Sequence, residues 1–149
     1  MGLLVWAISG TLIAGYYFTQ YKIYQNEYET LASEMESILL VNVLVSYGNG
    51  TKIWYNKTAL PLDSTAFKAI LAVADVNYTD YGGELGILVT SINGLTNNST
   101  HGWFYWYWDS GNSMWVLPEY SCAKYILHRD DVIAFTYESY STWPPPQPT

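Results

Sequence analysis

Charged side chains are scarce in this sequence, and most of those present are acidic. Lys and Arg together number 6 against 13 Asp and Glu, which gives a net charge of −7. So few cations cannot neutralise many phosphates, and we expect no nucleic acid partner. Docking on anionic lipid headgroups is excluded for the same reason.

Cysteine and histidine are equally scarce. Cys122 is the only cysteine, so an intrachain disulfide is excluded, and His101 and His128 are the only histidines. These residues do not make a Cys/His metal cluster. Asp130 and Asp131 fall far short of the oxygen set that calcium takes, and we expect them in a solvated turn. The sequence also has no phosphate loop and no nucleophile motif, so we expect no metal, no cofactor and no enzyme activity.

Apolar, aromatic and uncharged polar residues are present instead. Half of the 149 residues are hydrophobic, and the chain contains 15 Tyr and 7 Trp. This composition excludes disorder as the default. The length allows one domain and an appendage.

Residues 3–18 form an apolar run, and no charged side chain precedes Lys22. At the helical rise, such a run just crosses a bilayer core of about 30 Å. The basic flank of a secretory signal peptide or of an ordinary signal anchor is missing. We therefore expect a membrane anchor from which a basic leader has been trimmed.

A heptad seam follows, in which apolar residues recur at alternating steps of four and three. No glycine or proline interrupts residues 16–40. The pattern predicts one continuous helix over residues 2–38, with its second half packed on the following domain. The seam begins at Tyr17, and the residues expected to contact the domain are Tyr21, Tyr24, Tyr28, Leu31, Met35 and Ile38.

This long helix with an apolar first half resembles the N-terminal helix of type IV pilins, especially archaeal ones. Small residues such as Ala7, Gly10 and Ala14 allow neighbouring helices to approach closely. The resemblance implies that the apolar half is a membrane anchor before assembly and the core of a helical filament afterwards. The expected assembly core is Leu3, Leu4, Val5, Trp6, Ile8, Leu12, Ile13 and Tyr17.

From Leu39 the period changes to that of β-strands. The run Gly48-Asn49-Gly50 predicts a hairpin turn. Residues 66–74 predict a helix capped by Asp63 or Ser64, and the result is one sheet packed on one helix, an α+β unit. The expected strands cover residues 39–47, 51–56, 84–92, 102–108, 113–117, 123–127 and 132–137, before a polyproline-like tail at 143–149.

Four segments of this region, taken in order, resemble the transcobalamin C-terminal-like β-domain. They are Ser91-Ile92-Asn93-Gly94, then Gly102-Trp103-Phe104-Tyr105, then Ala123 to Leu127, then the closing run Asp131 to Tyr137. The resemblance covers about residues 41–137 and implies a module found on secreted and surface proteins. Asp130 stands where the pattern usually has glycine. Ligand binding does not follow from the fold alone.

The Asn-x-Ser/Thr triplet, which marks N-glycosylation sites, occurs five times. All five lie in predicted turns, loops or strand ends, where a glycan can reach solvent. Asn97 and Asn98 overlap, so only one of them is expected to be used. The candidates are Asn49, Asn56, Asn77, Asn97 and Asn98.

The run from Trp103 to Trp108 is aromatic throughout, with three residues on each face of a strand. One face must be core, and we expect the other to be buried at an interface between subunits. Trp103, Tyr105 and Tyr107 share one face of the strand, Phe104, Trp106 and Trp108 share the other, and the sequence does not assign the core to either.

The sequence therefore predicts three parts: a helix at 1–38, a β-rich surface domain at 39–140 and a Pro-rich tail at 141–149. The expected function is that of a structural subunit, a pilin, of an extracellular type IV pilus-like filament that serves surface adhesion. Its expected partners are copies of itself and N-linked glycans. Before assembly, the subunit is expected in the inner (cytoplasmic) membrane. The alternative is a single-pass, membrane-anchored surface protein whose β-domain binds a small ligand or a glycan, which a pocket beside the aromatic strand would favour.

Overall fold

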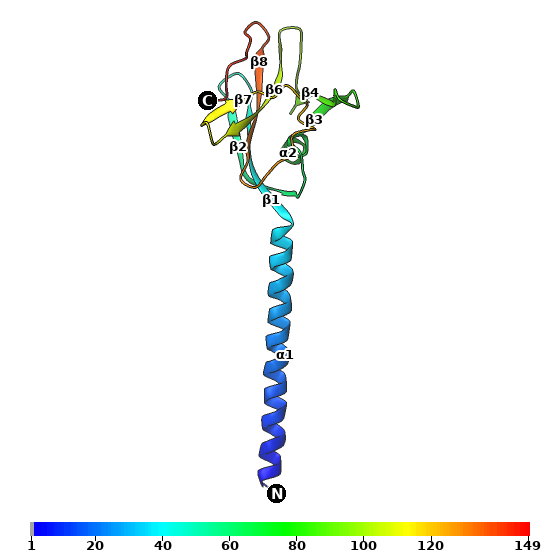
Figure 1. Ribbon diagram of the computed structural model, residues 1–149, viewed down its shortest axis with the longest axis vertical. Helices are drawn as coiled ribbons and strands as arrows, with labels where there is room; N and C mark the ends of the chain where they lie inside the picture. The colour runs from blue at the N-terminus through cyan, green and yellow to red at the C-terminus, as the bar shows by residue number, and fades with distance from the viewer. Residues whose placement is uncertain (1) are drawn as a thin grey trace. The chain divides into compact units, whose positions relative to one another are not determined.

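The computed structural model describes residues 2–149, with side chains in the first helix from Ile8 onward. The chain divides into two units at the Ser37–Ile38 junction, a helical one and a β-rich one (Figure 1). The predicted α+β class is confirmed. The elements are α1 (Gly2–Glu36), β1 (Ile38–Ser46), β2 (Lys52–Pro61), α2 (Ala66–Val73), β3 (Val76–Asp80), β4 (Ile87–Ile92), β5 (Leu95–Thr96), β6 (His101–Asp109), β7 (Met114–Val116) and β8 (Val132–Ser139).

Helix α1 is continuous, as the absence of glycine and proline after Gly15 predicts. It ends at Glu36, two residues before the predicted end, because the Ser37 hydroxyl donates to the Glu34 carbonyl at 2.7 Å and closes the last turn. Ile38 is therefore not a helical seam residue: it begins the β-branched run of β1. Among the helices that the structure describes, none combines the length and hydropathy of a membrane span.

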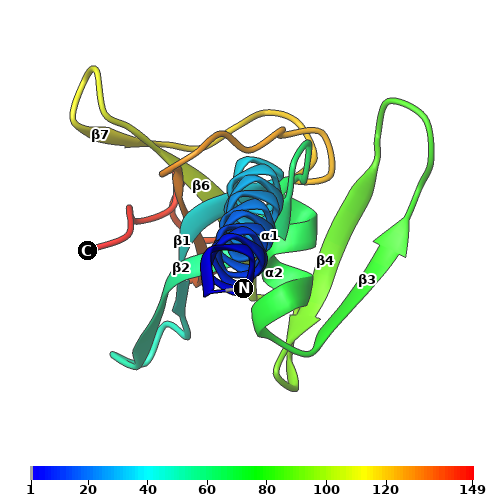
Figure 2. The same cartoon turned by 90° about the horizontal axis from the view of Figure 1, so that it is seen from below.

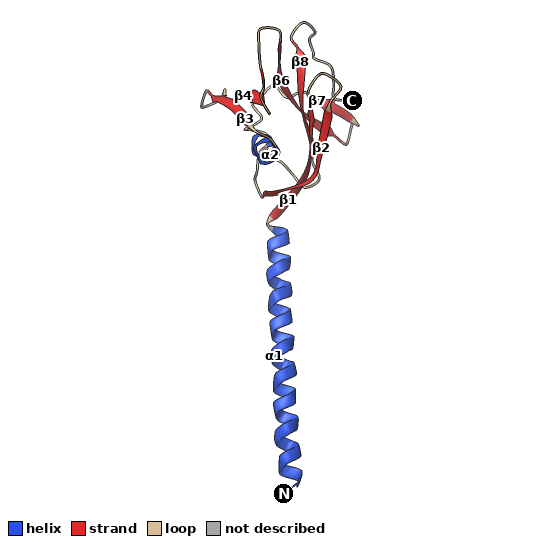
Figure 3. Cartoon of the chain, turned by 180° about the vertical axis from the view of Figure 1, so that it is seen from behind, coloured by secondary structure: helices blue, strands red, loops and turns tan. Residues whose placement is uncertain are grey.

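The larger sheet has five strands in the order β2-β1-β8-β6-β7. Its centre joins distant parts of the chain, because β1 and β8 pair in parallel, with Val43 opposite Ile133 (Figure 3). The predicted β1–β2 hairpin is confirmed. At its turn Gly48 has φ of 74°, and a Cβ atom there would collide with the Tyr137 carbonyl, so only glycine fits.

Strand β2 runs to Pro61, beyond the predicted end at Asn56. A bulge between Val41 and Val43 lets it continue. Lys57 takes φ of 53°, and its backbone N–H donates to the Asn42 side-chain oxygen at 2.9 Å. Such a bulge is not visible in the period of the sequence.

The prediction of one sheet was wrong, because β3, β4 and β5 form a second, three-stranded sheet. Strand β3 was missed, and its polar sequence VNYTD is exposed on nearly every residue. Helix α2 lies between the two sheets (Figure 2), and the Phe67 ring meets the Tyr78 ring of β3 edge to face at 4.8 Å.

Helix α2 is capped by Thr65, whose hydroxyl accepts from the Lys68 N–H, and not by the predicted Asp63 or Ser64. Residues 123–127 are not a strand but a turn-rich segment with a single bridge at Ile126. The Ala66 N–H donates to the Tyr125 carbonyl at 3.0 Å, so this segment satisfies the first turn of α2 instead of pairing in a sheet.

Two apolar clusters stabilise the β-rich unit, one on each face of the larger sheet. The main cluster unites β1, β8, α2 and β4 around Phe135 and Ile70. The smaller cluster packs Leu44, Trp106 and Ala134. The proline tail folds back on the unit: Pro145 and Pro148 are buried, and the Lys52 ammonium donates to Thr149.

Candidate functional site

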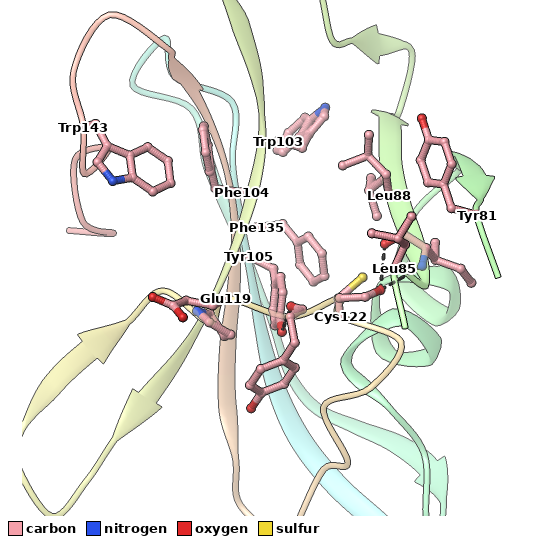
Figure 4. A pocket seen from close by; sticks show the side chains of 15 residues that line it. Tyr81, Leu85, Leu88, Trp103, Phe104, Tyr105, Glu119, Cys122, Phe135 and Trp143 are labelled. Atoms are coloured by element: carbon pink, nitrogen blue, oxygen red, sulfur yellow. Dashed lines mark hydrogen bonds between the residues drawn. The ribbon is translucent and has the colours of Figure 1, made fainter. Parts of the chain in front are cut away.

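A pocket of about 580 Å³ opens beside the aromatic strand β6 (Figure 4). It lies wholly within the β-rich unit and collects residues from β4, β6, β8, the turns at 81–85 and 118–122, and the tail. Its lining residues are Tyr81, Leu85, Ile87, Leu88, Val89, Trp103, Phe104, Tyr105, Pro118, Glu119, Tyr120, Ser121, Cys122, Phe135 and Trp143. A volume of this size suits a small molecule or one large side chain.

The walls of the pocket are aromatic. Trp103 and Tyr105 come from one face of β6 and Phe104 from the other, because the pocket reaches around the edge of the strand. Trp143 of the tail stands near Phe104, with 6.3 Å between ring centroids, and is 76% exposed. Aromatic faces of this kind accept flat or apolar groups.

Buried groups at the base of the pocket are neutral. Burial raises the pKa of the Cys122 thiol from 9.0 to about 12, so the thiol stays protonated at neutral pH. Burial, followed by the nearby phenol of Tyr120, raises the pKa of Tyr105 well above its usual value. The Tyr105 hydroxyl donates to the Tyr120 carbonyl at 2.6 Å.

The rim of the pocket is fixed by hydrogen bonds between its two turns. The Ser121 hydroxyl accepts from the Ile87 N–H at 2.9 Å and donates to the Ile87 carbonyl at 2.7 Å. The Lys124 ammonium donates to the Glu84 carbonyl at 2.6 Å. Gly86 sits against Ser121, where an added Cβ would lie 2.7 Å from the serine Cβ. These bonds tie the two turns of the rim together.

Few polar groups remain available to orient a ligand. The candidates are the Glu119 carboxylate and the Tyr120 hydroxyl, together with the free edge of β6. Strand β7 pairs with β6 only from Tyr107 to Asp109. The Trp103 N–H points away from β8 and is taken by the Asn97 side chain at 2.9 Å. By the two-residue period, the main chain of Tyr105 faces the same open edge.

The structure sorts the predicted aromatic residues into core and pocket. Trp103 belongs to the main core, with Tyr105 and Tyr107 packed against it, so this is the face that faces the core. The second face is covered within the chain: Trp106 is 2% exposed, and its indole N–H donates to the Thr136 hydroxyl at 2.9 Å. Trp106 is therefore not an interface residue, and of the predicted set only Trp108, at 37%, is exposed.

The sequons occupy different environments. Asn49, Asn56 and Asn77 are exposed, as glycan acceptors must be. The Asn97 side chain is engaged, because its amide N–H donates to the Val89 carbonyl at 3.0 Å and its oxygen accepts from Trp103. Asn98 is exposed and uses its side-chain oxygen to accept from the Thr100 N–H at 2.8 Å. Glycosylation at these sites stays a prediction.

Asp130 stands at the position where the closing pattern of the β-domain usually has glycine. It takes φ of 65°, the left-handed conformation that the usual glycine adopts readily. Asp131 stabilises the same turn by accepting from the His128 N–H at 2.8 Å. These contacts agree with the predicted turn.

The predicted helix residues fall into two groups. Leu3, Leu4, Val5 and Trp6 lie outside the residues whose side chains the structure describes. Ile8, Leu12, Ile13 and Tyr17 are exposed on α1, as are the seam residues Tyr21, Tyr24, Tyr28, Leu31 and Met35. The predicted contact of the seam with the domain stays a prediction.

Sequence reasoning missed the pocket residues outside β6. Tyr81, Leu85, Tyr120 and Trp143 are large apolar residues in turns and in the tail, and all four are exposed. The sequence did contain a signal for these residues, because large apolar side chains in turns beside Gly and Pro have no core position to fill and indicate a surface site. What joins them is tertiary structure, which the sequence period does not reveal.

The β-rich unit that carries this pocket is a domain of a known family. Residues 63–139, more than half of the chain, match the family described as Domain of unknown function (DUF4430), and the chain belongs to that family. Among curated proteins, none matches this sequence.

Solved structures extend the comparison to the fold. The crystal structure of haptocorrin in complex with Cbi matches with a TM-score of 0.57 and 13% identity, over 70% of this chain and 26% of haptocorrin. The chain thus spans about a quarter of the length of haptocorrin, and the likeness concerns the fold. A protein from Ruminococcus gnavus ATCC 29149 matches with a TM-score of 0.48 and 16% identity, over 68% of this chain and 97% of that protein. The haptocorrin match agrees with the transcobalamin-like resemblance of the β-domain.

Proposed function

We propose that this chain is a surface-displayed binding protein whose β-rich unit holds a small, largely apolar ligand in the pocket beside β6. The observation that carries the proposal is the pocket itself: about 580 Å³ walled by aromatic and aliphatic side chains on a hydrogen-bonded rim. Apolar pockets with a few convergent polar groups are typical of small-molecule sites. The pocket raises this alternative above the filament function that the sequence alone favoured.

The balance of polar and apolar groups selects the ligand class. A sugar needs several convergent hydrogen-bonding groups beside an aromatic face. Here the Ser121 hydroxyl is already bonded twice to Ile87, and the Cys122 thiol is buried. Flat or hydrophobic molecules with one or two polar atoms fit these walls better than glycans do. Binding without catalysis is the proposed role.

A charge placed inside the pocket tests the proposal. The full chain is titrated with the apolar fluorescent probe anilinonaphthalene sulfonate, with intrinsic Trp fluorescence as a second readout. Leu88→Asp puts a carboxylate among the lining residues, and Leu71→Asp makes the same change on α2 outside the pocket, where leucine exposure is similar, 42% against 46%. We expect saturable binding that weakens about tenfold or more in Leu88→Asp and is unchanged in Leu71→Asp.

The opposite pattern would overturn the proposal. Absence of saturable binding to the unmodified chain, or equal losses in both variants, would mean that the pocket is not the site. Circular dichroism of both variants shows whether the β-rich unit is still folded. A sugar panel that displaces the probe more effectively than apolar competitors would move the ligand class to glycans.

A second candidate function is the pilin-like filament subunit, and one observation favours it. The apolar side chains Ile8, Leu12, Ile13 and Tyr17 are exposed along α1. Burying them between the helices of a filament would remove apolar surface from water, which stabilises the assembly by roughly 25 cal/mol per Å². In this proposal the helix is held in the membrane before assembly and becomes the filament core afterwards.

Electron microscopy of sheared surface material, with mass spectrometry of the same fraction, tests the filament. Thin filaments with this chain as the dominant protein would support it, and the peptides would report which sequons carry glycans. Recovery of the chain only from detergent-extracted membranes, without filaments, would count against it.

A further inference from the structure

One face of α1 is a continuous apolar stripe, here called the tyrosine stripe. Its side chains are between 59% and 75% exposed in the single chain. A soluble surface rarely leaves so much aromatic area in one line without a partner. The tyrosine stripe consists of Tyr17, Tyr21, Tyr24, Tyr28, Leu31 and Met35.

The spacing of the stripe identifies the kind of partner. Its members follow one another at alternating steps of four and three, so that the pattern repeats every seven residues. A helix that packs on a globular core usually shows a broader stripe with a 3.6 period, whereas two apolar positions in seven is the seam of a coiled coil. From residue 19 to residue 36 the remaining positions are almost all polar, and neither glycine nor proline occurs.

The residues beside the stripe set the orientation. One flank carries Gln20, Glu27 and Glu34, and the other carries Gln25 and Ala32. In a parallel, in-register pair, the flank of one helix that carries Glu27 faces the flank of the other helix that carries Ala32. Glu27 then lies opposite Ala32 of the second copy, and no glutamates meet. An antiparallel pair would bring the glutamate flanks together, and like charges at close range repel.

The polar ends of the tyrosines also fit a seam. Tyrosine can bury its ring and keep its hydroxyl at the rim. Gln25 on the flank already donates from its amide to the Tyr21 hydroxyl at 2.8 Å. The hydroxyl therefore has a hydrogen-bond partner that does not depend on the seam being open to water.

We propose that residues 17–35 of α1 form a parallel, in-register coiled coil with other copies of this chain. The heptad spacing, the exposure of the stripe and the placing of Glu27 and Glu34 on one flank carry the inference together. It does not rest on the ligand-binding function, since the pocket is confined to the β-rich unit. Each oligomer would then carry several pockets, which raises avidity for a multivalent target.

Cysteine cross-linking of the full chain tests the pairing. Leu31→Cys and Tyr24→Cys place thiols in the stripe, while Ser33→Cys places one on the outer face of the same turn as a matched control. Cys122 is 3% exposed and contributes little background. Under mild oxidation we expect disulfide-linked dimers of both stripe variants at least tenfold faster than of Ser33→Cys.

Two stripe positions distinguish parallel from antiparallel pairing. They lie one heptad apart, about 10 Å along the helix. If Leu31 met its own equivalent in an antiparallel pair, the two Tyr24 positions would be about 20 Å apart and could not join. Cross-linking at both sites requires a parallel, in-register arrangement.

Sedimentation equilibrium of the unmodified chain supplies the second measurement. A mass of two or more chains that falls to one chain in Leu31→Glu, but not in Ser33→Glu, would support the coiled coil. A monomeric unmodified chain would overturn it, and would favour packing of the stripe on the β-rich unit. Long polymers without cross-links at positions 24 and 31 would also overturn it, because filament subunits are offset along the axis.

Discussion

Helix α1 and the β-rich unit contain the same types of apolar residue but differ in how far these residues are exposed. In α1, Tyr24 and Leu31 are 69% and 59% exposed. In the β-rich unit Tyr137 is buried, and its hydroxyl donates to the Thr96 carbonyl at 2.8 Å. The buried Tyr137 thus finds its hydrogen-bond partner within the domain, whereas the apolar stripe of α1 is exposed in the single chain. The difference teaches that richness in aromatics does not by itself predict a core: spacing decides.

The largest expected difference between the two regions appears when one apolar side chain of each is replaced by alanine. Phe135 is 1% exposed at the centre of the main core. Phe135→Ala should lower the free energy of unfolding of the β-rich unit by about 3–5 kcal/mol, because it leaves a cavity. Leu31→Ala should change that free energy by less than about 0.5 kcal/mol. Urea denaturation followed by Trp fluorescence measures both, and equal effects would contradict the comparison.

Thiol reactivity sharpens the comparison next. With its pKa raised to about 12 by burial, Cys122 has almost no thiolate at pH 8. Its labelling by a maleimide should be at least about a hundredfold slower than that of an exposed cysteine introduced by Ser33→Cys on α1. The rate should become ordinary in denaturant. Rapid native labelling of Cys122 would show that the base of the pocket opens.

Hydrogen bonding supplies a third, smaller test. Trp106→Phe removes the donor to the Thr136 hydroxyl in a fully buried site. We expect a loss of about 1–3 kcal/mol in unfolding free energy, since the hydroxyl is left unpaired. Tyr24→Phe on α1 should leave the unfolding of the β-rich unit unchanged. The same denaturation experiment checks both variants, and a neutral Trp106→Phe would mean that water replaces the indole.

The smallest expected effect concerns pH. Burial raises the pKa of Glu138, and His101 opposes that shift only in part. The folded state therefore binds this proton more tightly than the unfolded state, so its contribution to stability declines as pH rises above the ordinary value of 4.5. Glu138→Gln should flatten that decline. Thermal unfolding of both proteins between pH 4 and 7 measures it, and parallel curves would contradict it.

The sequence predicted elements whose signal is local. The continuous helix, the Gly48 turn and the aromatic strand β6 all follow from period and turn chemistry. It did not predict that residues 123–127 would cap α2, because a short apolar run reads as a strand whether its carbonyls meet another strand or a helix end. Strand β3 was not predicted because its apolar face consists of only two residues, Val76 and Tyr78, between polar ones.

Of the residues that line the pocket, the sequence predicted only those of the aromatic strand β6. Trp103 and Tyr105 were identified as a functional face, but Leu85, Tyr120 and Trp143 come from three segments that only the fold brings together. Trp106 was assigned to an interface because one strand cannot show that Leu44 and Ala134 already cover it. Tertiary neighbours, not propensity, decided these positions.

The parallel pairing of β1 with β8 has a consequence for how the protein is made. The first strand of the β-rich unit cannot complete its sheet until residues 132–136 have been synthesised, each ninety positions after its partner in β1. Helix α1, by contrast, needs only neighbours within its own turns. During synthesis, helix α1 can therefore form while the β-rich unit is still unfolded. The centre of its larger sheet closes as one of the last events, which leaves β1 dependent on its final neighbour arriving intact.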